Sequence, residues 1–287
     1  MGIFSAPSPS PTAAAHSPGG SALCAVDRTP STYIEFEGVK LGTRLVDFDL
    51  NIQAGETIAI VGPNGAGKSS LLRLLLGFEI PDQGIVRVAG RAVRDLRPKE
   101  RARLLSWLPQ RLNVSSDFKA IDLAMATRYA LGEEPVTSRF QAEKALAQLD
   151  VAEFAERKVT TLSGGELQRV LLAALVAQDA PLVLADEPAN HLDPYHQLTT
   201  YRALANLARQ AKTLLVVTHD VALLPLLGPA AQVRVLGLER GRLQLDAFLA
   251  DPNLPRALSD LFRVPISRRA DGGLEVAWKI DAEELAL

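Results

Sequence analysis

Residues 62–69 read Gly-Pro-Asn-Gly-Ala-Gly-Lys-Ser and follow the apolar run Thr-Ile-Ala-Ile-Val at 57–61. The apolar run is typical of a buried strand, and residues 69–76 are helix formers that stop at Gly77. Glycines let successive backbone N–H groups turn inward around phosphate oxygens, because no Cβ stands in the way. The stretch predicts a strand, a triphosphate-binding loop and a helix; an ordinary glycine-rich turn is the alternative.

The last residues of this loop carry the charges and ligands that a triphosphate needs. Lys68 can reach the β- and γ-phosphates, and the Ser69 hydroxyl can ligate Mg²⁺. The helix that follows presents its positive N-terminal end to the same anion. The nucleotide-binding residues predicted here are Gly62, Pro63, Asn64, Gly65, Ala66, Gly67, Lys68, Ser69 and Ser70.

A second apolar run, residues 182–185, ends in the carboxylates Asp186 and Glu187. The end of a buried strand is where a nucleotide site begins in an α/β sheet. Phosphoryl transfer needs a bridging cation and a carboxylate beside the attacking water. We therefore expect Asp186 to hold the metal with Ser69, and Glu187 to act on the water; a plain strand-end turn is the alternative.

Residues 162–166, Leu-Ser-Gly-Gly-Glu, form a second candidate anion site ahead of an apolar helix. Ser163 offers a hydroxyl, and Gly164 and Gly165 offer unencumbered N–H groups at a helix N-terminus. Ser163 and Glu166 also have the spacing of a capping box, which is the purely structural alternative. Two phosphate-binding loops in one chain suggest that one of them acts on a neighbour's nucleotide.

Composition narrows the class of protein. Among 287 residues, 47% are hydrophobic, and 31 basic against 33 acidic residues give a formal charge of −2. No basic footprint for nucleic acid or an anionic membrane is present. The longest apolar stretches, 170–185 and 221–238, are broken by polar residues and proline, so any membrane contact is expected to go through a partner. The single cysteine, Cys24, excludes an internal disulfide.

Strand-like and helix-like segments alternate along most of the chain, which predicts an α/β fold with a mostly parallel sheet. Strands are expected at 33–36, 45–52, 57–61, 85–88, 182–185 and 214–217, and helices at 69–76, 98–105 and 195–210. We divide the chain into a disordered tail rich in Ser, Pro, Ala and Gly at 1–32, a main domain at 33–240, and a C-terminal appendage at 241–287. A helical insertion is expected at about 112–166, since helix formers dominate there.

The motifs occur together in a recognisable order. That order is residues 62–69, Gln110, residues 162–166, Asp186 with Glu187, residues 190–193, and Thr218 with His219. The set resembles the ABC ATPases and spans nearly everything between Tyr33 and Val235. The resemblance implies a P-loop NTPase core with an antiparallel β subdomain and a helical subdomain insertion. It also implies ATP and Mg²⁺ as cofactors, and a head-to-tail homodimer that sandwiches two ATP molecules.

Individual roles follow from the resemblance. Gln110 corresponds to a glutamine that touches Mg²⁺ and couples to the membrane partner. Without the resemblance, a glutamine that merely follows a turn would be the preferred interpretation. Ser163 to Glu166 correspond to the signature that closes over ATP held by the opposite subunit. Asp193 corresponds to an aspartate that crosses between subunits, and His219 to the histidine that contacts the γ-phosphate. The implied catalytic residues are Glu187, His219 and Lys68, and the implied metal ligands are Ser69, Gln110 and Asp186.

Two details bear on the subfamily. The sequence resembles the importers of cobalamin, iron-siderophores and haem at residues 190–197 (NHLDPYHQ), at Glu166 and at residues 261–264. The alternative interpretation is that these are exposed helix-start residues of a generic cassette. The family commonly stacks an aromatic ring on adenine at about residues 39–42. Here that run is Val-Lys-Leu-Gly, so Leu41 offers apolar contact only.

These features predict the ATP-hydrolysing subunit of an importer of metal chelates. Its expected partners are integral membrane permease subunits and, indirectly, a substrate-binding protein, with no nucleic acid. Its expected location is the cytoplasmic face of the membrane. The alternatives are a soluble ABC ATPase outside transport, a transporter ATPase for another cargo, and a nucleotide-binding scaffold without turnover; the intact Lys68, Asp186, Glu187 and His219 oppose the scaffold.

Overall fold

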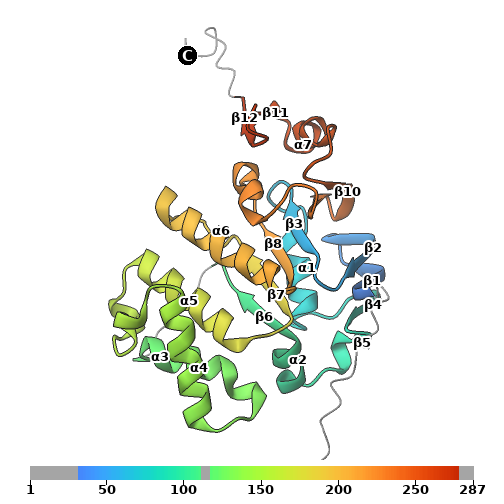
Figure 1. Cartoon of the computed structure of the whole chain (residues 1–287). Helices are drawn as coiled ribbons and strands as arrows, with labels where there is room; N and C mark the ends of the chain where they lie inside the picture. Colours follow the sequence, from blue (N-terminus) through green and yellow to red (C-terminus); the bar gives the residue numbers. More distant parts are fainter. Residues whose placement is uncertain (1–31, 111–116, 278–287) are drawn as a thin grey trace, which may run out of the picture.

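The computed structural model describes residues 32–110 and 117–277. The expected tail, except its last residue, lies outside the described residues, as do Cys24, the expected start of the helical insertion near 112, and the end of the chain from residue 278. Within the described residues the chain forms two large sheets, a small two-stranded sheet and a group of helices (Figure 1).

The main sheet has six strands in the order β10-β9-β3-β8-β7-β6. The strands are β3 (Thr57–Val61), β6 (Leu105–Leu108), β7 (Leu182–Asp186), β8 (Thr213–Val217), β9 (Val233–Glu239) and β10 (Arg242–Phe248). All pairs from β9 to β6 are parallel, and only β10 is antiparallel to its neighbour. This arrangement confirms the predicted mostly parallel sheet.

The central strand β3 is buried on both faces, which explains its uninterrupted apolar sequence. Because side chains alternate along a strand, Ile58 and Ile60 pack into one core cluster, and Ala59 and Val61 pack into another on the opposite face. The sheet therefore separates two apolar layers, and the loop that follows β3 emerges at its carboxyl edge.

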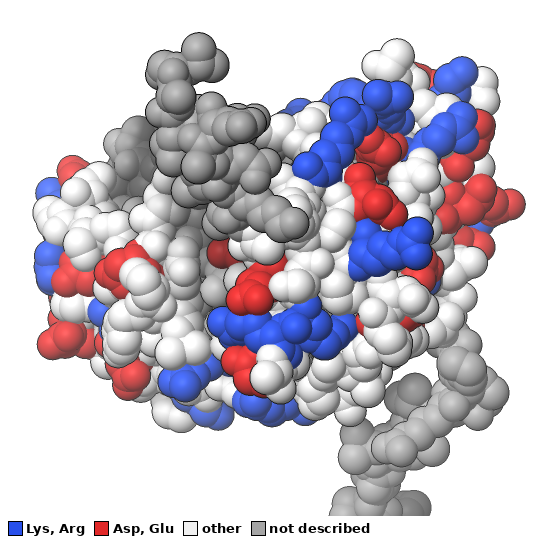
Figure 2. Space-filling view, turned by 90° about the horizontal axis from the view of Figure 1, so that it is seen from above, with Lys and Arg blue, Asp and Glu red and all other residues white. Residues whose placement is uncertain are grey.

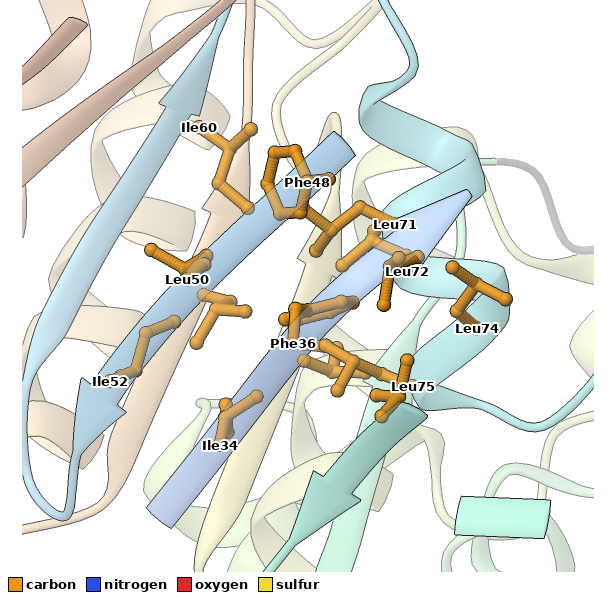
Figure 3. Close-up of a cluster of buried hydrophobic side chains, with 14 of the residues drawn as sticks. Ile34, Phe36, Phe48, Leu50, Ile52, Ile60, Leu71, Leu72, Leu74 and Leu75 are labelled. Atoms are coloured by element: carbon orange, nitrogen blue, oxygen red, sulfur yellow. The ribbon is translucent and has the colours of Figure 1, made fainter. Parts of the chain in front are cut away.

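The second sheet is antiparallel, in the order β2-β1-β4-β5. Its strands are β1 (Thr32–Leu41), β2 (Leu45–Gln53), β4 (Gln83–Val88) and β5 (Arg91–Ala92). Helix α1 (Lys68–Leu75) lies between this sheet and the main one and buries its leucines against both. Figure 3 shows Phe36 and Phe48 of the antiparallel sheet near Leu71 and Leu72 of α1, with Ile60 of the main sheet beside them.

Helices form a group on the side of the molecule opposite the antiparallel sheet (Figure 1). The group consists of α3 (Ala120–Thr127), α4 (Pro135–Gln148) and α5 (Gly164–Gln178), whereas α2 (Pro98–Leu104) lies near β5 and α6 (Pro194–Arg209) packs against the main sheet. The 3-10 turns are at Val93–Asp95, Arg128–Leu131, Ala152–Phe154, Val159–Thr161 and Val221–Leu227. Helices α3, α4 and α5 share one core cluster built largely from alanine. Since Ala173, Ala174 and Ala177 of α5 belong to it, this helical core extends past residue 166.

The C-terminal segment adds β10, helix α7 (Leu254–Phe262), and the small hairpin β11 (Ile266–Arg268) and β12 (Leu274–Val276). The expected boundary at 240 falls in the tight turn between β9 and β10, and β10 extends the main sheet by one strand. Leu254 and Leu258 of α7 are buried in the same cluster as Ala59 and Val61, on one face of the main sheet. The segment after 240 thus shares its core with the main sheet.

Sequence reasoning did not predict strand β6 of the main sheet. Strand β6 is only four residues, Leu-Ser-Trp-Leu, and it follows α2 without an intervening turn signal. Ser106 is 1% exposed and Trp107 is 37% exposed, so the strand does not show a clean apolar alternation.

None of the helices in residues 32–110 and 117–277 has the length and apolarity needed to cross a membrane.

Replacing Phe36 with alanine is expected to lower the free energy of unfolding by about 3 to 5 kcal/mol, because the ring is 1% exposed and meets Phe48 edge-to-face. The matched control is Phe140→Ala, whose ring is 63% exposed. Urea unfolding of both variants measures the difference. Equal destabilisation of the two variants would contradict the packing described here.

Candidate nucleotide site

The predicted phosphate-binding loop, residues 62–69, is called the phosphate loop below. Its shape depends on two places where its backbone closely approaches a neighbouring backbone. At Gly62, with φ of +146°, a Cβ would lie 2.2 Å from the carbonyl oxygen of Leu238 on β9. At Gly67, with φ of +106°, a Cβ would lie 2.4 Å from the carbonyl oxygen of Arg44. Neither approach is possible for a residue with a side chain, so glycine is required at both positions.

The loop lines a cavity of about 270 Å³. Its walls are Arg44, Asn64, Gly65, Ala66, Gly67, Lys68, Ser69, Ser70, Gln110 and Glu187. The cavity thus brings Gln110, which follows β6, and Glu187, which follows β7, to the loop between β3 and α1. Their meeting follows from topology, because parallel strands present their carboxyl ends at one edge of the sheet.

Lys68 is 7% exposed, and its ammonium is held by the loop itself. Its Nζ donates hydrogen bonds to the carbonyl oxygens of Gly62 at 2.6 Å and Pro63 at 3.0 Å. Burial lowers the pKa of Lys68, while the charges of Glu187 and Asp186 act in the opposite direction. The side chain is therefore positioned beside the loop by contacts that an anion could replace.

Asp186 at the end of β7 carries a buried oxygen in need of a partner. Its Oδ1 is inaccessible to solvent and has no hydrogen-bond partner among the described residues. Burial raises the pKa of Asp186, as does the charge of Glu187, whereas Lys68 and a hydrogen bond with Ser69 lower the pKa. An unpaired carboxylate oxygen next to a hydroxyl suits a hard divalent cation.

The donors available fit Mg²⁺ in particular. The described residues hold no cluster of three or more His, Cys, Asp or Glu side chains that would enclose a metal. Mg²⁺ is usually held by one or two protein oxygens, with phosphates and waters completing its shell. Asp186, Ser69 and Gln110 are the side chains that would hold it beside the phosphates.

Glu187 and His219 form a pair at the carboxyl ends of the neighbouring strands β7 and β8. The Nδ1 of His219 lies 2.5 Å from Oε2 of Glu187. Glu187 has φ of +50°, a conformation that is costly for a non-glycine residue, and its N–H donates to the carbonyl of Val217 at 2.9 Å. The strained backbone aims a carboxylate of which only 12% is exposed into the cavity, with the histidine beside it.

The loop at 163–166 forms the start of α5, and the capping box considered from sequence as the structural alternative is present. The N–H of Ser163 donates to Oε2 of Glu166 at 2.7 Å, and the N–H of Glu166 donates to Oγ of Ser163 at 3.4 Å. These residues do not line the phosphate cavity of their own chain, and neither does Asp193. Within the described residues, the two candidate anion sites are therefore separate.

Asp193 caps α6 and fixes a histidine against the second loop. Its Oδ1 accepts from the N–H of His196 at 2.9 Å, and its Oδ2 lies 2.8 Å from His196 Nδ1. A Cβ on Gly165 would lie 2.6 Å from Nε2 of the same ring. The loop that carries Asp193 and the loop that carries Ser163 are thus in direct contact through His196 and Gly165.

Two features of the site were not identified from sequence. Arg44 lines the phosphate cavity, and its only sequence signal is a cation in the turn before β2. A second hollow of about 70 Å³ adjoins Glu187 and His219 and is lined in part by His191 and Gln197. The sequence singled out both of these residues only for the subfamily they resemble.

Replacing Gly165 with alanine is expected to cost about 1 to 3 kcal/mol of stability, because the new Cβ would overlap the His196 ring. Gly164→Ala is the matched control, since no atom lies within 4 Å of a Cβ placed there. Thermal unfolding compares the two. If the contact is as described, adding His196→Ala to Gly165→Ala restores part of the lost stability; purely additive losses would argue against it.

Comparison with known proteins places these features in a family. The family model described as ABC transporter matches residues 45–190. The chain is 38% identical over 232 residues to the hemin import ATP-binding protein HmuV of Streptomyces coelicolor, covering 79% of this chain and 81% of that protein. It is 40% identical over 191 residues to the cobalamin import ATP-binding protein BtuD of Halobacterium salinarum, covering 63% of this chain. The chain spans about half of that relative, 47% of its length.

Relatives of similar identity carry other names as well. The lipoprotein-releasing system ATP-binding protein LolD of Xanthomonas campestris is 37% identical over 231 residues, covering 78% of this chain and 93% of that protein.

Solved structures share the fold. A metal-chelate type ABC transporter in an inward-facing conformation superposes with a TM-score of 0.72 at 23% identity, covering 88% of this chain and 99% of the other. A bacterial ABC transporter cassette solved as a dimer superposes with a TM-score of 0.67 at 27% identity, covering 76% of this chain and 99% of the other. The sequence match and the shared fold agree, and the chain belongs to the ABC transporter family of ATP-binding cassettes.

Proposed function

We propose that this chain is the ATP-hydrolysing subunit of an ABC importer that takes up a metal chelate such as haem, cobalamin or an iron-siderophore. The observation that carries the ATPase part is the single cavity that unites Lys68, Ser69, Gln110 and Glu187, with the unpaired Asp186 oxygen beside Ser69. The import part is supported by the hemin and cobalamin import relatives and rests on similarity.

In the proposed reaction the loop binds the triphosphate through its backbone N–H groups. Lys68 exchanges its bonds to the loop carbonyls for bonds to phosphate oxygens, which compensates the cost of its burial. Mg²⁺ held by Ser69 and Asp186 would neutralise charge that develops on the phosphates. Glu187 orients a water and accepts its proton, and His219 holds that carboxylate in place.

A second copy of the chain completes the proposed site. The 163–166 loop has open space around Gly164 and lies apart from the phosphate cavity of its own chain. It would close over nucleotide bound to the partner, as the family resemblance implies, and Asp193 would cross the interface beside it. The related cassette solved as a dimer supports the pairing of two chains.

A surface near Gln110 suits the proposed permease. Phe78 and Ile80 are 56% and 67% exposed, and the Phe78 ring meets Trp107 edge-to-face with centroids 5.5 Å apart. Exposed aromatic groups of this size mark interaction surfaces. Trp107 lies on β6, three residues before Gln110, so a partner seated there would sense the state of the cavity. A permease would place the chain on the cytoplasmic face of the membrane, with a substrate-binding protein acting indirectly.

Two alternatives differ in partner. On the face shown in Figure 2, basic side chains are interspersed with acidic ones, which gives little support to a soluble ABC ATPase that acts on nucleic acid. A transporter ATPase for another cargo is the nearer alternative, given the lipoprotein-releasing relative. The cargo would be selected by the permease and binding protein.

Glu187→Gln is expected to reduce the rate of ATP hydrolysis by about 100-fold or more while leaving ATP binding intact, because the amide cannot accept the proton. Phosphate release and equilibrium binding of ATP measure the two properties separately. The control is Glu239→Gln, a partly exposed carboxylate that pairs with Arg263 outside the cavity. Hydrolysis by Glu187→Gln at the parent rate would refute the role given to this residue.

Trp107→Glu is expected to abolish co-purification with the proposed permease, and to leave basal ATP hydrolysis of the isolated chain within about twofold. The charge would sit in the centre of the aromatic surface, where burial against a partner is costly. Phe140→Glu is the control, since Phe140 is also exposed but lies on α4. Undiminished co-purification of Trp107→Glu would place the permease elsewhere.

A further inference from the structure

The base of the nucleotide lacks an evident aromatic partner in this chain. Leu41, which stands where the family resemblance places a ring, is 5% exposed and belongs to the core between the two sheets. It pairs with Leu45 across the turn that joins β1 to β2. None of the described residues that line the phosphate cavity is aromatic. A different side chain must therefore meet the base.

Arg44 is the one cavity-lining cation besides Lys68 among the described residues, and its backbone is firmly placed. Its N–H donates to the carbonyl of Leu41 at 2.9 Å. Its carbonyl oxygen lies 2.4 Å from a Cβ position on Gly67 and 2.7 Å from one on Gly241. The turn is thus packed between the phosphate loop and the β9–β10 hairpin. This packing fixes the backbone position from which the Arg44 side chain extends.

The guanidinium is held by its edges. Nη1 lies 3.3 Å from Oγ of Ser70 and 3.0 Å from Oε1 of Glu79, and Nη2 lies 2.6 Å from Oε2 of Glu79. Glu79 is itself held by Nε of Arg73 at 2.6 Å. A bidentate carboxylate fixes the plane of a guanidinium. The side chain nevertheless remains 51% exposed, so the plane is set while much of the group stays open.

This geometry distinguishes two possible uses of the cation. Glu79 and Ser70 occupy both N–H groups of Nη1 and one of Nη2, so a phosphate would have to use Nε–H and the remaining N–H of Nη2. Stacking needs only a face, and Arg stacks readily on aromatic rings. Arg44 contacts Ser70, which is the last residue of the predicted nucleotide-binding segment.

We propose that the Arg44 guanidinium, oriented by Glu79, is the platform on which the adenine of ATP stacks, in place of an aromatic ring. The proposal rests on the proposed function, since it assumes that the cavity binds ATP. Because stacking reads the π-face and not the base edges, GTP should bind nearly as well as ATP.

The test compares ligands with and without a base. Dissociation constants of ATP, GTP and inorganic tripolyphosphate are measured by calorimetry, in the presence of Mg²⁺, for the full chain and its variants. Arg44→Ala is expected to weaken ATP and GTP by about 3- to 10-fold and to leave tripolyphosphate unchanged. Arg44→Lys should behave like Arg44→Ala towards ATP, because it keeps the charge and lacks the plane.

The matched control is Arg73→Ala, which removes the other cation from Glu79 and does not line the cavity. It should bind all three ligands like the parent chain. Equal weakening of ATP and tripolyphosphate by Arg44→Ala would show a phosphate contact, and unchanged ATP affinity would show no contact; either result overturns the proposal. Loss of ATP affinity in Arg73→Ala equal to that in Arg44→Ala would assign the effect to Glu79 and overturn it too.

The outcome for the parent chain separates this inference from the proposed function. If the parent chain binds neither ATP nor tripolyphosphate, the proposed function fails and the inference fails with it. If the parent binds and hydrolyses ATP while Arg44→Ala and Arg44→Lys bind ATP equally well, only the inference fails. Arg44→Lys keeps a cation that can pair with Glu79, so it serves as the second variant if Arg44→Ala does not fold.

Discussion

The close packing of the phosphate loop against two neighbouring backbones is the constraint on which the rest of the structure depends. Gly62 approaches the carbonyl of Leu238 on the main sheet, and Gly67 approaches the carbonyl of Arg44 in the turn of the antiparallel sheet. The loop is thereby held between the two sheets, where it lines the phosphate cavity. Helix α1, which follows at once, carries the leucines that fill the space between the sheets. Binding and folding consequently use the same short segment.

Much of the fold follows from patterns that are local in sequence. The run at 57–61 became β3 at its expected bounds, and the helix after the loop appeared where the leucines predict it. Strand β6 was missed because four residues with a buried serine carry too little periodicity. The helical core continues into α5 because this helix packs against helices that precede it by many residues.

The candidate site likewise contains some residues that sequence patterns identify and others that they do not. Lys68, Ser69 and Glu187 are found at the cavity because motif spacing and strand order place them there. Arg44 was missed, since its position depends on the turn packing against Gly67 and Gly241, which are distant in sequence. The contact between His196 and Gly165 was missed for the same reason. Sequence motifs identify these cavity-lining groups, whereas the residues that position them emerge only from three-dimensional packing.

The central claim is that one chain holds half of each ATP site. Sedimentation of Glu187→Gln measures it directly, because ATP should persist on a chain that cannot hydrolyse it. The account predicts a monomer without ATP, a dimer with ATP and Mg²⁺, and a monomer that still binds ATP when Ser163→Arg is added to block the second loop. A Glu187→Gln chain that binds ATP and stays monomeric, or a double variant that dimerises equally well, would contradict the account.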